Sequence, residues 1–173
     1  NNLKGLATGT KVRVLEDNNL TGDADIEWIT SVTGYDEKAR PILGHTKNPY
    51  LGTEDIVEST LNFTGQPIYT KTHHLKTGKP ELIIYDRYTY DRMGRLLKHK
   101  QSQTPQSGWQ MGPYTHVITE NYYDELGQLV SKGVGGKSTF LNRLQTVDYE
   151  YNIRGWLKKI NNPDVTLYGD LFA

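Results

Sequence analysis

The segment Tyr123-Asp124-Glu125-Leu126-Gly127-Gln128-Leu129-Val130 decides the fold, because it holds the full pattern that recurs along the chain. An apolar or aromatic residue is followed by Asp or Asn, two variable residues, Gly, one variable residue and a pair that is apolar or contains Pro. An Asp or Asn that opens a turn accepts a hydrogen bond from the backbone two residues on. Gly takes the positive φ that a type I turn with a G1 bulge requires. The segment therefore predicts a β-hairpin.

Five copies of this pattern occur, and they begin at Tyr35, Leu61, Tyr90, Tyr123 and Tyr151. We expect turns near residues 36–39, 62–65, 91–94, 124–127 and 152–155. Ala39 stands where the other copies have Gly. The predicted turn residues are Asp36, Asn62, Gly65, Asp91, Gly94, Asp124, Gly127, Asn152 and Gly155. The Gly-equivalent positions are 26, 29, 33 and 28 residues apart, which indicates a constant turn and loops of variable length.

Strand-like runs flank the turns. In residues 146–151, Val147, Tyr149 and Tyr151 alternate with Asp148 and Glu150, as in a strand with one apolar face. A lone hairpin is barely stable, so successive hairpins should pair edge to edge. We predict an all-β fold of tandem antiparallel hairpins in a curved, twisted repeat sheet, as a single array over residues 1–173. The sequence leaves open a curved open sheet or a closed barrel.

Composition excludes several classes of protein. Lys plus Arg equals Asp plus Glu at 20 each, which argues against nucleic-acid binding, since that normally needs a basic excess. No apolar run is long enough to span a bilayer as a helix. The chain has no Cys, so disulfides, thiolate zinc sites and Cys nucleophiles are excluded.

Catalytic and cofactor motifs are weak. Gly133–Thr139 is similar to a P-loop, but Ser131 stands where the first Gly is required, so a flexible loop is expected. His73 and His74 are neighbours, and on a strand they would point to opposite faces rather than chelate one metal. Carboxylates recur at one turn position, which favours a turn role. We predict no catalytic residue, no cofactor and no metal.

The aromatic residues allow a second interpretation. Trp28, Trp109 and Trp156 could form a sugar-binding platform with the Tyr set, although cross-strand packing is favoured. Trp109 lies in a Gly- and Pro-containing segment, and we name Trp109 and Tyr114 as candidate ligand contacts.

The repeats at residues 90–96 and 123–129 resemble YD repeats of the RHS (rearrangement hot spot) family. Residues 147–157 are similar to the version in very large secreted or cell-surface proteins of Bacteroidetes, and Gly169–Ala173 is similar to the segment that comes after that version in those proteins. The resemblance implies a spiral β-sheet that forms a hollow shell around a C-terminal domain, often a toxin, at the cell surface or outside the cell. The family's Asp-Pro-x-Gly-Leu-type processing signature has no match, so self-cleavage is not carried over to any residue.

From these observations we expect a segment of a longer protein with a structural, non-catalytic role in such a shell. Its partners would be the rest of its parent chain and the enclosed domain. The alternative is a cell-surface module that binds carbohydrate or protein. Open strand edges would also favour self-association.

Overall fold

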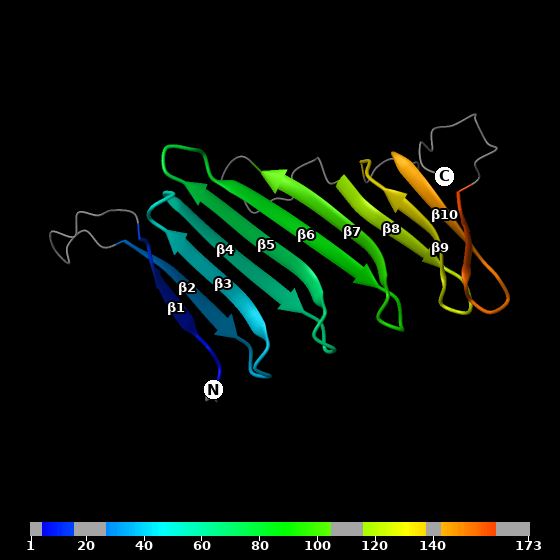
Figure 1. Cartoon of the computed structure of the whole chain (residues 1–173), viewed down its shortest axis with the longest axis horizontal. Coiled ribbons are helices and arrows are strands. Elements are labelled where there is room, and N and C mark those ends of the chain that lie inside the picture. The colour runs from blue at the N-terminus through cyan, green and yellow to red at the C-terminus, as the bar shows by residue number, and fades with distance from the viewer. Residues whose placement is uncertain (1–4, 16–26, 105–115, 138–142, 162–173) are drawn as a thin grey trace. The chain divides into compact units, whose positions relative to one another are not determined.

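A computed structural model of the chain describes residues 5–15, 27–104, 116–137 and 143–161. These residues form eleven strands and no helix (Figure 1). The strands are β1 (Gly9–Arg13), β2 (Trp28–Tyr35), β3 (Pro41–Asn48), β4 (Thr53–Leu61), β5 (Pro67–Lys76), β6 (Leu82–Tyr90), β7 (Leu96–Thr104), β8 (His116–Tyr123), β9 (Leu129–Val134), β10 (Gln145–Tyr151) and β11 (Leu157–Ile160).

The strands follow chain order in one open antiparallel sheet, from β1 to β11. This arrangement confirms the predicted all-β fold of tandem hairpins. Each of the five repeats supplies one hairpin, namely β2/β3, β4/β5, β6/β7, β8/β9 and β10/β11. β1 precedes them and pairs with β2, where Val12 lies opposite Ile29. Among the described strands, β1 and β11 end the order.

The five repeat turns share one backbone geometry. In the first, Ala39 N donates to Asp36 O (3.0 Å) and Asp36 N donates to Arg40 O (2.9 Å). The same two bonds occur in the other four turns. The residue at the Gly-equivalent position has a positive φ in all five, from 60° at Ala39 to 93° at Gly65. This is the type I turn with a G1 bulge, and it leaves a register irregularity beside the turn, as between Gly34 and Tyr35.

The described residues fall into two compact units. The first contains the residues up to Tyr85 with residues 103–104, and the second contains residues 86–102 and the residues from 116 onward. Figure 1 shows the strands of each unit side by side. Whether residues 1–173 form a single array stays a prediction.

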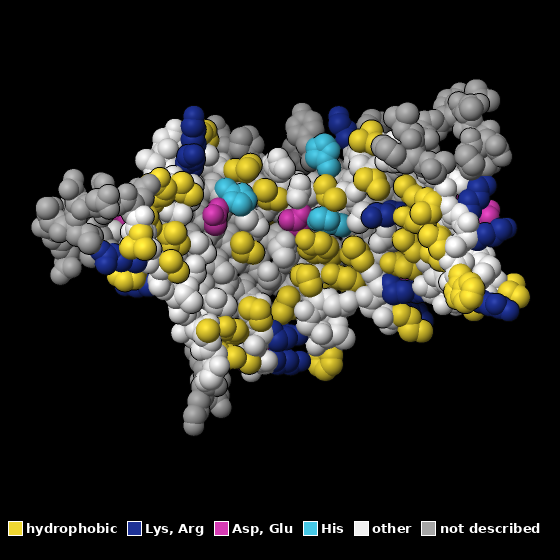
Figure 2. Space-filling view, in the orientation of Figure 1, with side chains coloured by type: hydrophobic (Ala, Val, Ile, Leu, Met, Phe, Trp, Pro, Cys, Tyr) yellow, Lys and Arg dark blue, Asp and Glu magenta, His cyan; other side chains and the backbone are white. Residues whose placement is uncertain are grey.

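The first unit has one layer, and its two faces both expose apolar side chains. Val32 lies opposite His45, and His45 lies opposite Ile56, so all three share a face. Val57 follows Ile56 and therefore lies on the other face. Val32 is 49% exposed and Val57 38%. Figure 2 shows hydrophobic side chains open to view on the face that it draws.

Few apolar side chains are buried. Ile83 and Tyr85 in the first unit and Val117 in the second are the buried hydrophobic residues of the described chain. Stability must therefore come chiefly from backbone ladders, turns and cross-strand pairs rather than from a two-layer core.

The left-handed turn position gives a direct test. Gly127 has a φ of +84°, so Gly127→Ala should lower the free energy of unfolding by about 1–2 kcal/mol, because an L side chain is strained there. Ala39→Gly should act in the opposite direction by about 0.5 kcal/mol, since Ala39 already bears this strain. Urea unfolding of the 173-residue chain measures both.

Gly44→Ala is the matched control, because Gly44 lies in strand β3 and an added Cβ would meet nothing within 4 Å. It should leave stability unchanged or raise it. If Gly127→Ala and Gly44→Ala behaved alike, the left-handed turn would not constrain the fold.

Candidate functional site

The side chain that opens each turn has one constant role. The Oδ1 atom of Asp36, Asn62, Asp91, Asp124 or Asn152 accepts a hydrogen bond from the N–H four residues on, at 2.7–3.0 Å. In three turns the same oxygen also accepts the N–H two residues on, as from Lys38 to Asp36 at 2.8 Å. The sequence indicated the second bond, but not the first, which is the one that all five turns share.

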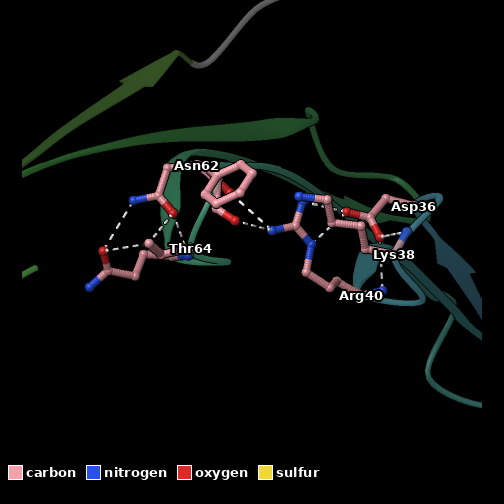
Figure 3. A network of polar contacts seen from close by, with 7 residues as sticks. Asp36, Lys38, Arg40, Asn62 and Thr64 are labelled. Atoms are coloured by element: carbon pink, nitrogen blue, oxygen red, sulfur yellow. Dashed lines mark hydrogen bonds and ion pairs between the residues drawn. The ribbon is translucent and has the colours of Figure 1, made fainter.

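In the first unit, an arginine joins neighbouring turns. Arg40 Nε donates to Asp36 Oδ2 (2.6 Å), and Arg40 Nη1 donates to Asn62 O (3.0 Å) in the next turn (Figure 3). Lys38 Nζ lies 4.1 Å from the centroid of the Phe63 ring. The chain therefore uses the residue after the left-handed position to connect one turn to the next.

The second unit repeats this arrangement with other contacts. Arg95 forms an ion pair with Asp91, and its guanidinium lies 4.5 Å from the ring centroid of Tyr123, which opens the next repeat. The Tyr123 hydroxyl donates to Leu96 O (3.1 Å), and the Tyr151 hydroxyl donates to Leu129 O (3.0 Å). The repeated Tyr thus bonds to the preceding hairpin. Arg at two equivalent positions was the sequence signal that could have predicted these contacts.

Four histidines pair with carboxylates, which the sequence did not predict. His45 Nε2 lies 2.7 Å from Glu54 Oε1, His74 Nδ1 lies 2.6 Å from Asp55 Oδ1, and His99 Nε2 lies 2.7 Å from Asp86 Oδ1. His73 pairs with Glu81. His73 lies opposite Ile56 and His74 opposite Asp55, so the neighbours point to opposite faces as strand alternation predicted. In the described residues, no three His, Asp or Glu side chains are grouped to hold a metal.

The described part of the P-loop-like segment lies in strand β9 and in the residues after it, which continue the pairing with β8. Val134 ends β9, Gly135 and Gly136 have positive φ, and Lys137 forms a bridge with His116. Ser138 and Thr139 lie outside the described residues, as do the candidate ligand contacts Trp109 and Tyr114.

No long apolar helix that could cross a bilayer occurs in the part of the chain that the structure describes.

Each unit has a hollow of notable size. The first unit has a hollow of about 520 Å³ with Lys47, Lys76 and Lys79 beside Glu54 and Glu81. The hollow of the second unit measures about 510 Å³ and lies over β6, β7 and β8. Its charged residues are Arg87, Lys98, Lys100 and Glu120. Both hollows have more cations than carboxylates, and the excess is larger in the second, where three cations accompany one glutamate.

Glu120 is the carboxylate of the second hollow, and its charge is already engaged by two cations. It forms ion pairs with Lys98 and with Arg143 Nε (2.8 Å). Burial acts to raise the pKa of Glu120, but the hydrogen bonds from Lys98 and Arg143 outweigh it and hold this pKa below its usual range. Glu120 is therefore ionised at neutral pH and already shared between two cations.

A scan against models of protein families finds no match for the chain, and a search of the curated proteins also finds none.

The hydroxyl of the repeated Tyr gives a second prediction. Tyr123→Phe should lower the free energy of unfolding by about 1 kcal/mol, because it removes the hydrogen bond to Leu96 O. Tyr149→Phe is the matched control, since the described residues offer its hydroxyl no partner. Equal stability of the two variants in thermal unfolding would show that the hydroxyl does not join the hairpins.

The turn carboxylates predict a loss of stability in acid. The backbone N–H of Arg40 is the main cause that holds the pKa of Asp36 below its usual value, and burial opposes it. For Asp91, burial raises the pKa, and the hydrogen bonds from Arg95 and Met93 outweigh it. A pKa that is lower in the folded state adds stability above the unfolded value of about 3.9, and this stability is lost as pH falls through the folded pKa.

Asp91→Asn keeps the Oδ1 acceptor, as natural Asn62 and Asn152 do, but cannot titrate. We expect the variant to fold and to lose less stability than the wild type between about pH 5 and pH 2, as measured by the urea midpoint at each pH. The same acid dependence in both proteins would rule out a contribution from the Asp91 carboxylate.

Proposed function

We propose that the chain is a non-catalytic structural segment of an RHS/YD-repeat type β-shell that encloses or presents a C-terminal effector domain at the cell surface or outside the cell. The observation that carries this proposal is the repeated hairpin with one constant turn geometry in a one-layer sheet. A one-layer sheet covers a large area with few residues, and each hairpin pairs with the edge strand of its neighbour.

The contacts between repeats support a structural role. Arg40 binds the next turn, and Tyr123 and Tyr151 bind the preceding hairpin. These residues bond repeat to repeat. Tyr123 and Tyr151 occupy a position that the motif keeps nearly constant, whereas Arg40 occupies the variable position after the Gly-equivalent residue. The constant residues of the repeat therefore hold the hairpins of the sheet together, and the carboxylates among them act as turn residues rather than catalytic ones.

Exposed apolar side chains indicate what the partner would be. Four repeat turns carry a large apolar residue at the tip, 83–104% exposed: Phe63, Met93, Leu126 and Ile153. Within each unit the turns lie at the same end of the strands (Figure 1). In a shell, neighbouring protein would cover apolar side chains on the sheet faces and at the turn tips. The rest of the parent chain and the enclosed domain are the partners that a shell supplies.

The test uses the longest natural chain that contains this segment. We expect limited proteolysis to leave its C-terminal domain intact while exposed parts are cut, because the wall keeps protease out. Mass spectrometry and size exclusion would find that domain retained with the wall, even after any cleavage between the two. A control sample opened with denaturant should lose the C-terminal domain to the same protease.

A C-terminal domain that protease removes readily from the native parent chain would contradict enclosure. The cell-surface binding module, with Trp109 and Tyr114 as candidate contacts, would then be the better proposal.

A further inference from the structure

We propose that the hollow of the second unit is a binding site for an acidic sugar, a saccharide unit that bears a carboxylate or a sulfate. This site is separate from the structural role, and it stands whether or not the chain is part of a shell. It is formed by β6, β7 and β8, with Arg87, Lys98, Lys100, Glu120, Asn121 and Tyr122 among its lining residues.

Charge is the first reason. Glu120 is the carboxylate of this lining, and Lys98 and Arg143 already share it. The described residues give no ion-pair partner to Arg87 or Lys100, which line the same hollow. Neighbouring cations without a counter-charge repel each other, and an anion in the hollow would relieve that repulsion. A guanidinium can also bind a carboxylate or sulfate group through two parallel hydrogen bonds.

The remaining lining residues favour a sugar over a bare anion. Tyr122 is 53% exposed, so part of its side chain is free to contact the apolar face of a sugar ring. Thr89 also lines the hollow, and its hydroxyl oxygen is an acceptor for the hydroxyl groups of a saccharide. Cations, an aromatic ring and a neutral polar residue in one hollow of about 510 Å³ match the chemistry of an acidic saccharide.

The site is held rigid by bonds to the backbone. Asn121 Nδ2 donates to Leu96 O (2.9 Å), which ties β8 to β7. Thr89 Oγ1 donates to Lys98 O (3.2 Å), which ties β6 to β7. A site whose walls are already ordered loses less entropy when the ligand binds. The first unit's hollow has a smaller excess of cations, because two glutamates, Glu54 and Glu81, accompany its lysines and a single glutamate lines the second.

Calorimetric titration of the 173-residue chain tests the site with four probes: heparin oligosaccharides for sulfate, hyaluronan oligosaccharides for carboxylate, neutral dextran, and poly-glutamate as an acidic peptide. We expect one or both acidic saccharides to bind saturably and dextran not to bind. The Arg87→Gln/Lys100→Gln double variant should bind about tenfold more weakly or worse, because two charged contacts are lost. Tyr122→Ala should also weaken saccharide binding.

The matched control is Lys76→Gln/Lys79→Gln, which removes the same charge from the hollow of the first unit and should change affinity less than about twofold at about 0.15 M salt. Three results would overturn the site. The first is that the acidic saccharides bind no better than dextran, and the second is that the two double variants behave alike. The third is that poly-glutamate binds as tightly as the saccharides while Tyr122→Ala has no effect, which would indicate charge attraction alone.

Discussion

The structure depends on one hydrogen bond, from a backbone N–H to the side-chain oxygen that opens each turn four residues earlier. Together with a residue at positive φ, it closes a turn that has a single strand register. In the first turn Arg40 N bonds to Asp36 Oδ1, and Ala39 carries the positive φ. Because side chains alternate along a strand, a register set at the turn also sets which face every residue of the hairpin occupies.

The turn matters more here than in a two-layer protein. Three apolar side chains are buried in the described residues, so no thick core exists there to correct a register error. Cross-strand neighbours and turn contacts must hold each hairpin to the next. The hydroxyl of Tyr151 on Leu129 O and the guanidinium of Arg40 on Asn62 O are contacts of this kind. The same thin construction leaves apolar surface that a larger assembly would cover.

The hairpins and their turns could be predicted from residue types, because turn formation is local. Asp or Asn with Gly three residues later is enough to place a turn, and even Ala39 was placed correctly by its position in the repeat. The histidine pairs could not be predicted in this way. His45 meets Glu54 through the pairing of β3 with β4, and His73 of β5 meets Glu81, which lies just before β6, so both contacts join one hairpin to the next and the turn motif does not specify them. His74 meets Asp55 and His99 meets Asp86 within one hairpin, but none of these four residues belongs to the turn motif. Trp109 and Tyr114 lie outside the described residues and stay predictions.

By itself, the sequence determined the all-β class, the five hairpins and the turn residues, since each depends on about eight consecutive residues. Only the tertiary structure decided which charges neutralise each other and which do not. Glu120 forms ion pairs with Lys98 and Arg143, whereas Arg87 and Lys100, which line the same hollow, form no ion pair with a carboxylate of the described residues. An overall formal charge of zero conceals this local excess, because pairing depends on distances between strands and not on totals along the chain.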